Sequence, residues 1–209
     1  MLFSRWGEYM FRILLYLVWS NYGDFLAGEK NMTKLCGIDE AGRGPLAGDL
    51  VMAGVVLNKP IEGLMDSKKI SEKKREELYS IIVQNSQYHI ISFSPQEIDE
   101  LGLSHCLGRG LESILEHIEA ELYLFDGNQT FGVLGVSTMV KADSKVAEVS
   151  AASILAKVTH DRAIIKSSAL YPNYGFEKHK GYGTKAHIEA IKKFGYSPIH
   201  RKSFKIKGI

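Results

Sequence analysis

The sequence has few cysteines, no long apolar run and little net charge. Its two cysteines, Cys36 and Cys106, lack the spacing of a metal-binding pair, so we expect both to fill the core of a protein from a reducing compartment. The apolar run Phe11–Trp19 is shorter than the roughly 20 residues that cross a bilayer, and no membrane partner is expected. A net charge of +2 over 209 residues, with 45% apolar residues, is typical of one large globular domain or a domain with an appendage.

The small net charge hides an uneven distribution along the chain. Residues 178–209 contain nine Lys/Arg and one acid, a balance of +8, whereas residues 1–177 contain 17 basic and 23 acidic residues, a balance of −6. A basic tail on an acidic body indicates a polyanionic partner. The alternative is a basic helix face that is simply solvated.

The stretch Gly37–Gly48 carries the strongest chemical signal. Asp39 and Glu40 are predicted to end a short strand, and residues 50–57 form a second, β-branched strand. Two adjacent carboxylates near a core repel one another and lose hydration. A divalent cation would compensate both costs, because carboxylate oxygens are its preferred ligands.

A glycine-rich turn follows the acid pair directly. Gly42 and Gly44 let the backbone approach a ligand closely, and Arg43 offers a forked cation that suits phosphate. The pattern indicates metal-assisted chemistry on a phosphodiester. A β-hairpin with an exposed acidic turn is the structural alternative. A dinucleotide-binding loop requires a helix after the glycines, whereas Pro45 and a strand follow here.

The order of predicted elements indicates an α/β fold. It is strand, strand, helix, strand, helices, strand, strand, helix, which gives a sheet with helices on its faces. After the first two strands, the expected elements are a helix at 72–84 capped by Ser71, a strand at 88–93, helices at 95–101 and 104–120, strands at 121–125 and 138–140, and helices at 147–167 and, capped by Thr184, up to Phe194.

Two further acids follow predicted strands. Asp126 ends the strand at 121–125 and Asp143 precedes the helix at 147–167. Taken singly, Asp126-Gly127 is a turn signal and Asp143 is a helix-capping residue. If the first and fourth strands are neighbours, about 4.8 Å apart, these acids converge with Asp39 and form a site for two Mg²⁺ or Mn²⁺ ions.

Three other segments have two interpretations each. Lys68 can reach phosphate or be solvated. Tyr182, between two glycines, can stack on a sugar or base or be a partly buried turn residue. Residues 1–33 are expected to lie outside the fold, with a helix near 8–20 and with Met32 as the true start, so that the domain spans 34–209.

The motifs together resemble ribonuclease HII in one order over residues 35–204. They are Gly37–Gly48, Asp66–Ser71, Asp126-Gly127, Lys141–Ser144, Ala151–Thr159, His179–Thr184 and Ile199–Phe204. The resemblance implies a ribonuclease H-like mixed sheet flanked by helices, with a C-terminal helical and basic extension. It also implies a cytoplasmic, monomeric hydrolase with roles in ribonucleotide removal from DNA and in RNA primer removal.

The resemblance implies cleavage of the RNA strand of RNA–DNA hybrids and of the 5′ side of single ribonucleotides in duplex DNA, leaving 5′-phosphate and 3′-hydroxyl ends. Asp39, Glu40, Asp126 and Asp143 would be the catalytic acids and the ligands of two Mn²⁺ or Mg²⁺ ions. Gly42, Arg43 and Gly44 would contact the ribose 2′-hydroxyl and the adjacent phosphate, Tyr182 would stack on the junction sugar, Lys68 would bind substrate, and the basic tail would hold the duplex backbone.

The chain departs from the family pattern at three places. Asp49 replaces a proline or small residue and adds an acid near the cluster, His160 replaces an arginine, and Gly108-Arg109-Gly110 is expected to interrupt the middle helix. No cluster acid is lost. Two alternatives stay open: a catalytically silent nucleic-acid-binding module on the same fold, and ribonuclease HIII, for whose extra N-terminal domain residues 1–33 are too few.

Overall fold

The computed structural model describes residues 33–64 and 70–206. The helix expected near residues 8–20 and the substrate-binding expectation for Lys68 lie outside these ranges. The strands are β1 (Leu35–Ala41), β2 (Leu50–Leu57), β3 (Ser86–Phe93), β4 (Leu122–Asp126) and β5 (Val136–Met139). The α-helices are α2 (Glu72–Gln84), α3 (Pro95–Leu101), α4 (Leu103–His117), α5 (Ala147–Leu170), α6 (Phe176–His179) and α7 (Lys185–Phe194), and the 3-10 helices are η3 (Ala142–Ser144) and η4 (Pro172–Tyr174).

The five strands form one mixed sheet in the order β3-β2-β1-β4-β5. The first three strands are antiparallel neighbours, whereas β4 pairs parallel with β1 and β5 pairs parallel with β4. The expected α/β mixed sheet flanked by helices is therefore confirmed. Because β1 is central and is followed in the sheet by the parallel strand β4, the ends of these two strands lie side by side.

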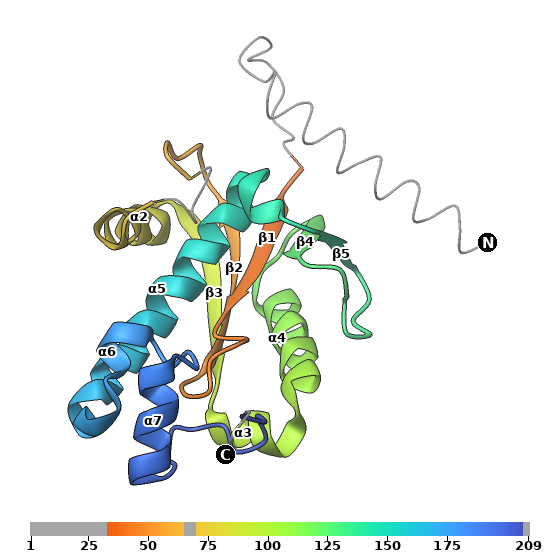
Figure 1. Cartoon of the computed structure of the whole chain (residues 1–209). Helices are drawn as coiled ribbons and strands as arrows, with labels where there is room; N and C mark the ends of the chain where they lie inside the picture. Colours follow the sequence, from red (N-terminus) through yellow and green to blue (C-terminus); the bar gives the residue numbers. More distant parts are fainter. Residues whose placement is uncertain (1–32, 65–69, 207–209) are drawn as a thin grey trace.

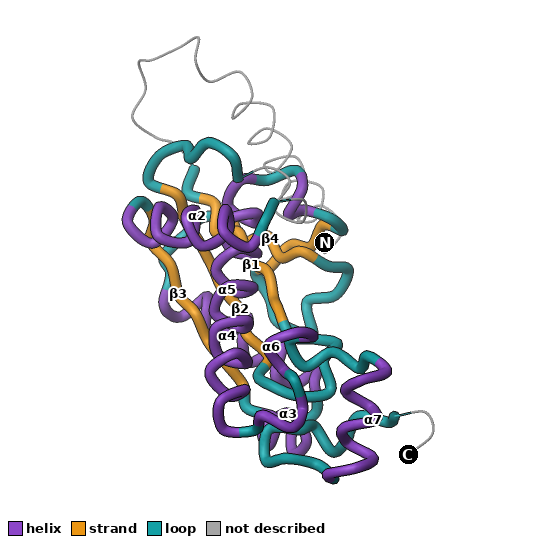
Figure 2. Tube along the Cα trace, turned by 60° about the vertical axis from the view of Figure 1, so that its left-hand side comes forward, coloured by secondary structure: helices purple, strands orange, loops and turns teal. Residues whose placement is uncertain are grey.

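Helices cover both faces of the sheet (Figures 1 and 2). On one face α2 and α5 pack on alternate residues of β2, represented by Val51, Ala53 and Val55. On the other face α4 packs on the intervening residues of β2, such as Leu50 and Met52, in the cluster that also contains both cysteines. This alternation is what a strand buried on two faces requires. The cysteines are free thiols and fill the core as expected.

The helix α4 runs through Gly108-Arg109-Gly110, so the expected interruption is wrong. Gly110 faces β2, and a Cβ at this position would lie 2.1 Å from the Sδ of Met52. A glycine normally weakens a helix by about 1 kcal/mol. Here it allows the helix to approach the sheet, so close packing offsets the poor helical propensity.

The helix ends agree with the capping signals in the sequence. The Ser71 side chain accepts a hydrogen bond from the backbone N–H of Lys74 at the start of α2. Thr184 accepts one in the same way from His187 at the start of α7. These side chains satisfy backbone donors that have no partner inside the helix.

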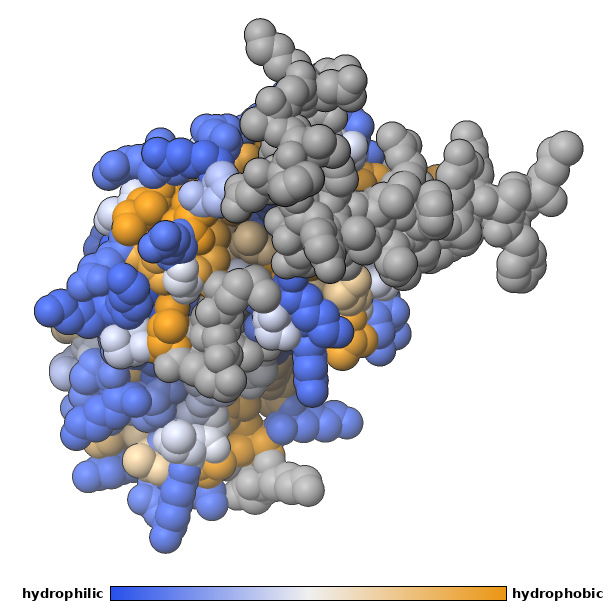
Figure 3. All heavy atoms as spheres, turned by 90° about the horizontal axis from the view of Figure 1, so that it is seen from above, coloured by the Kyte–Doolittle hydropathy of each residue, from blue (hydrophilic) through white to orange (hydrophobic). Residues whose placement is uncertain are grey.

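The surface seen from above carries mostly hydrophilic side chains with apolar residues between them (Figure 3). Among the described residues, Leu134 and Leu170 are the most exposed large apolar side chains, at 88% and 73%. No helix in the described ranges combines the length and apolar character needed to cross a membrane.

Candidate active site

The end of β1 and the end of β4 bring two acids together. Ile38 pairs with Phe125 in the parallel register, and Asp39 and Asp126 are the next residues of the two strands. Asp143 comes from η3, and the backbone N–H of Ala142 in this turn donates to Oδ1 of Asp126 over 3.1 Å. One carboxylate oxygen from each of the three aspartates lies within 4.8 Å of the others.

The structure contradicts the helix-capping interpretation of Asp143. The N-cap of α5 is Val146, which makes no side-chain capping bond, so the interpretation of Asp143 as the helix-capping residue is wrong. Asp143 is 2% exposed and faces Asp39 and Asp126. Three carboxylates that converge in this way repel one another, and a bound cation would offset that repulsion.

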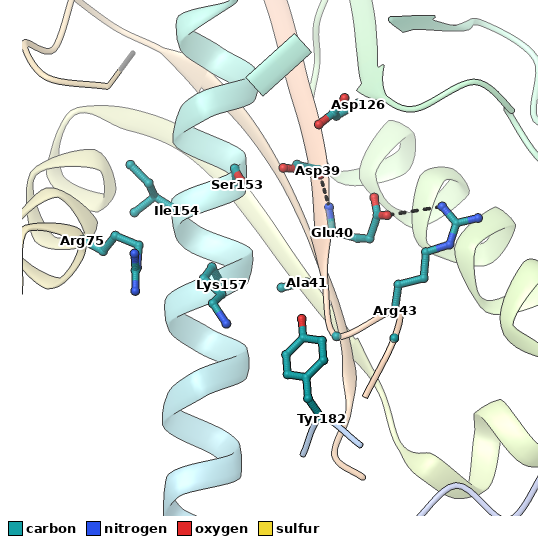
Figure 4. Close-up of a pocket in the computed structure, with 12 residues that line it drawn as sticks. Asp39, Glu40, Ala41, Arg43, Arg75, Asp126, Ser153, Ile154, Lys157 and Tyr182 are labelled. Atoms are coloured by element: carbon teal, nitrogen blue, oxygen red, sulfur yellow. Dashed lines mark hydrogen bonds and ion pairs between the residues drawn. The ribbon is translucent and has the colours of Figure 1, made fainter. Parts of the chain in front are cut away.

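Asp39 is held in an environment that disfavours its charge. Burial raises its pKa well above the ordinary value, and the neighbouring charges of Glu40 and Asp126 raise it further. Hydrogen bonds from Ser153 and from the backbone N–H of Glu40, the latter 2.8 Å long, act in the opposite direction. Figure 4 shows the Asp39 carboxylate between Ser153 and Asp126.

Glu40 completes the acid cluster, the name used below for Asp39, Glu40, Asp126 and Asp143. Its Oε1 lies 3.5 Å from a terminal nitrogen of Arg43 (Figure 4). Its Oε2 is buried and has no hydrogen-bond partner in the described part of the chain. Burial raises the pKa of Glu40, and Arg43 opposes this shift.

The acid cluster fits divalent cations. Its donors are all hard carboxylate oxygens, which suit Mg²⁺ and Mn²⁺ better than softer metals. An unpartnered buried carboxylate oxygen on Glu40 and an elevated pKa at Asp39 are both unfavourable in the protein alone. A bound cation would remove each penalty. A purely structural role for the same residues would not explain why the protein keeps two such unfavourable features.

A pocket of about 430 Å³ opens beside the acid cluster. Its lining combines three of the acids, all but Asp143, with the Gly42–Gly44 turn, Lys157 and Tyr182. In Figure 4 the tyrosine ring lies across the pocket from Arg43, with its hydroxyl toward the acids. The Nζ of Lys157 is 5.9 Å from the centre of this ring. The pocket thus has an anionic end and a cationic, aromatic end.

The two glycines of the turn have different roles. Gly42 has a φ of +87°, and a Cβ there would lie 2.3 Å from the carbonyl oxygen of Asp49, so only glycine fits without strain. Gly44 is exposed, and a Cβ there would meet Tyr182 at 3.8 Å. Gly42 therefore fixes the shape of the turn, while Gly44 leaves its backbone open to a ligand.

Three polar residues of the pocket lining had no predicted role in the site: Ser153, Lys157 and Arg75. The first two stand four residues apart on α5, a spacing that puts side chains on one helix face. From this spacing the sequence could have predicted that Ser153 and Lys157 face the same pocket. Arg75 reaches the pocket from α2, and its guanidinium donates to the carbonyl oxygen of Ile70 over 2.7 Å.

The departures at positions 49 and 160 lie behind the turn. Asp49 is not among the residues that line the pocket, so the structure does not support an added acid at the cluster. Burial raises the pKa of Asp49, while His160 and Arg201 act against that shift. His160 is 1% exposed, and its Nδ1 lies 3.0 Å from Oδ1 of Asp161.

The family model and the curated relatives name the same family. The family model described as Ribonuclease HII matches residues 36–207. A ribonuclease HII of Sulfurovum sp. (strain NBC37-1) is 68% identical over 181 residues, which cover 86% of this chain and 96% of the relative.

Solved structures extend the likeness. The structure of a complex of PCNA and RNase HII from Archaeoglobus fulgidus matches with a TM-score of 0.73 and 28% identity, over 83% of this chain and 96% of that chain. The ribonuclease H2 of Pyrococcus horikoshii OT3 matches with a TM-score of 0.70 and 32% identity, over 82% and 94% of the two chains.

Proposed function

The chain belongs to the ribonuclease HII family, and from this membership we propose that it cleaves the RNA strand of RNA–DNA hybrids and the 5′ side of single ribonucleotides in duplex DNA. The products would carry 5′-phosphate and 3′-hydroxyl ends. The family assignment itself makes the protein a ribonuclease H, a hydrolase that acts as an endoribonuclease. The convergence of three carboxylates within 4.8 Å carries the proposal, since it is the element that hydrolysis needs.

The acid cluster would hold two divalent cations, Mg²⁺ or Mn²⁺. Asp39, Asp126 and Asp143 offer converging oxygens, and the unpartnered Oε2 of Glu40 offers a fourth. When bound, such ions supply Lewis-acid stabilisation of the phosphodiester and an activated water. The chain holds these carboxylates in fixed positions, because they stand on two paired strands and a short 3-10 helix.

The cationic end of the pocket would bind the substrate strand. Arg43 and the backbone of Gly42 and Gly44 face the pocket, where they can hydrogen-bond a ribose 2′-hydroxyl and the adjacent phosphate. Tyr182 offers an aromatic face that is 44% exposed and can stack on a sugar. The 2′-hydroxyl is the group that distinguishes a ribonucleotide from its deoxy neighbours.

A cleavage assay tests the function. The substrate is duplex DNA that contains one ribonucleotide, with Mg²⁺ or Mn²⁺, and the matched control is the same duplex without the ribonucleotide. We expect one cut on the 5′ side of the ribonucleotide, with the end groups mapped as stated. Binding of both duplexes without cleavage would instead support the silent binding module.

A variant of one cluster acid completes the test. Asp143→Asn should lower turnover by more than about a hundredfold, because even partners of metal ligands contribute about 10- to 100-fold, while duplex binding persists. Glu119→Gln is the matched control, since Glu119 is an exposed acid away from the pocket. Unchanged turnover in the Asp143 variant would remove this residue from the reaction.

A further inference from the structure

The C-terminal segment, residues 197–204, packs behind both loops that form the cationic end of the pocket. Its backbone pairs with the loop after the Gly42–Gly44 turn: Gly48 N–H donates to the Ile199 carbonyl, and Arg201 N–H donates to the Leu46 carbonyl, both over 2.9 Å. The same loop reaches the tyrosine loop, because Leu46 N–H donates to the carbonyl of Gly181 over 2.9 Å. The segment therefore supports a loop that itself contacts the tyrosine loop, although the two loops are far apart in sequence.

Arg201 points into the protein, although the basic tail was expected to hold the duplex backbone. Its side chain is among the largest that are fully buried, at 1% exposure. Its Nε and one terminal nitrogen donate to the carbonyl of Gly48 over 2.9 and 2.7 Å, and the other terminal nitrogen lies 3.4 Å from the carbonyl of Arg43. The guanidinium thus holds the backbone of the turn and is not available to phosphate.

The neighbouring residue, His200, reaches the other loop through His187. Ser197 N–H donates to Nδ1 of His200 over 2.9 Å, and Nε2 of His200 lies 3.0 Å from Nε2 of His187. Nδ1 of His187 lies 2.9 Å from the carbonyl oxygen of Tyr182. His187 and His200 are both buried, at 0% and 1% exposure.

These contacts fix the protonation of both rings. An amide N–H can only donate, so Nδ1 of His200 is the acceptor and its Nε2 carries the hydrogen. A carbonyl can only accept, so Nδ1 of His187 carries a hydrogen and its Nε2 is free to accept. The four assignments agree, and the chain of hydrogen bonds runs in one direction from Ser197 to Tyr182.

We propose that Arg201, His200 and His187 are positioning residues that set the Gly42–Gly44 turn and Tyr182 at a fixed distance across the substrate pocket. This rests on the proposed function, because it assigns these loops to the substrate strand. The Tyr182 side chain is exposed and its loop turns sharply, with φ of +50° at Lys180 and +82° at Gly181. The hydrogen bond from His187 restrains the Tyr182 end of this loop, beside the bond that Leu46 makes to Gly181.

The functional test is a double-mutant cycle. His187→Leu removes the donor to Tyr182 and should lower kcat/KM on the ribonucleotide-containing duplex by up to about a hundredfold, the loss that a small misplacement produces. In a Tyr182→Ala background the same change should cost little more, because the positioned group is already gone. Equal losses in both backgrounds would show a general structural effect and overturn the proposal.

Conservative variants separate positioning from folding. His187→Asn keeps an N–H near the Nδ1 position and should recover most of the activity that His187→Leu loses. Arg201→Lys keeps the charge but not the fork that holds Gly48 and Arg43, and should lower kcat/KM at least about tenfold. Mn²⁺ affinity should match wild type in all three variants. A parallel loss of Mn²⁺ binding would contradict a role confined to the pocket loops.

A measurement on the unmodified protein keeps the proposal testable if a variant fails to fold. Imidazole ¹⁵N NMR at neutral pH should show His187 protonated at Nδ1 and His200 at Nε2. The opposite tautomers, or a charged ring, would overturn the hydrogen-bond chain. This result does not depend on cleavage, so a wild-type protein that fails to cut the duplex would refute the proposed function separately.

Discussion

The acid cluster and the C-terminal segment both bury polar groups, but they leave them in opposite states. In the acid cluster Glu40 retains a buried oxygen without a partner, and burial and like charges raise the pKa of Asp39. In the C-terminal segment Arg201 and His200 direct their donors to matched acceptors at 2.7–3.4 Å. Three acids of the cluster line the pocket, whereas the C-terminal segment packs behind the loops that do so.

The difference shows which part of the molecule is complete by itself. Buried polar groups are normally paired, and unpaired ones cost free energy. The C-terminal segment needs nothing further, so it can fix the shape of the pocket before a ligand arrives. In the acid cluster, by contrast, one buried oxygen of Glu40 has no partner in the described part of the chain, as is expected where a cation is to be bound.

Replacing Asp39 should have the largest effect on the contrast between the acid cluster and the C-terminal segment. Asp39→Asn removes one cluster ligand and should lower turnover by more than about a hundredfold. The same change removes a buried charge that Glu40 and Asp126 disfavour, so the metal-free protein should become more stable by on the order of 1 kcal/mol. Cleavage assays and thermal unfolding in the presence of a chelator measure the two effects.

Asp161→Asn is the matched control for stability. Burial opposes the charge of Asp161, but hydrogen bonds from His160 and Lys157 over 3.0 and 2.8 Å hold its pKa below the ordinary value. This substitution should therefore destabilise the metal-free protein. If both variants shifted stability in the same direction, the contrast between strained and satisfied carboxylates would be wrong.

Much of the sheet and part of the site could be predicted from local sequence. Residues 50–57 have the apolar, β-branched pattern of a buried strand, 121–125 are largely apolar and aromatic, and Ser71 and Thr184 are helix caps by residue type. The acids Asp39 and Asp126 could be placed at strand ends for the same reason. That they converge depends on the parallel pairing of β1 with β4, which joins residues too distant in sequence for any local pattern to reveal.

The direction of side chains was the main thing that the sequence did not provide. Composition predicted a basic tail, but it could not distinguish the buried Arg201 from the exposed Lys202. The link between His187 and His200 likewise depends on how α7 packs against the C-terminal segment. Gly110 was misjudged because helical propensity is local, whereas its contact with Met52 is tertiary.

Acidification should weaken the C-terminal segment. Burial lowers the pKa of His200 from 6.5 to about 4, and repulsion from a proton taken up by His187 would act in the same direction. Between these values the unfolded chain takes up a proton that the folded protein excludes, so stability is full above pH 6.5 and falls as the pH decreases toward 4. By pH 4 the loss should reach about 3 kcal/mol.

Urea unfolding at several pH values, with His200→Asn as the comparison, measures this contribution. Carboxylates also titrate in this pH range. They are common to wild type and the variant, so their contributions cancel in the difference between the two stability curves. The pH dependence of the variant should be shallower than that of wild type between pH 6.5 and 4. Parallel curves would mean that His200 does not stay neutral when the protein is folded.

Lys202 offers the smallest and most selective change. Its backbone N–H donates to Asp99 over 2.8 Å, a bond that alanine retains, and its side chain is exposed. If the outward-facing part of the tail contacts duplex phosphate, Lys202→Ala should weaken binding a few-fold and reduce the slope of log K against log salt by about 1. Binding is measured by titration with a chelator present, so that no cleavage occurs.

The matched control is Lys34→Ala. Lys34 is an exposed lysine at the start of β1, and its replacement should leave the slope unchanged. An unchanged slope for Lys202→Ala would show that this lysine is merely solvated and makes no contact with duplex phosphate.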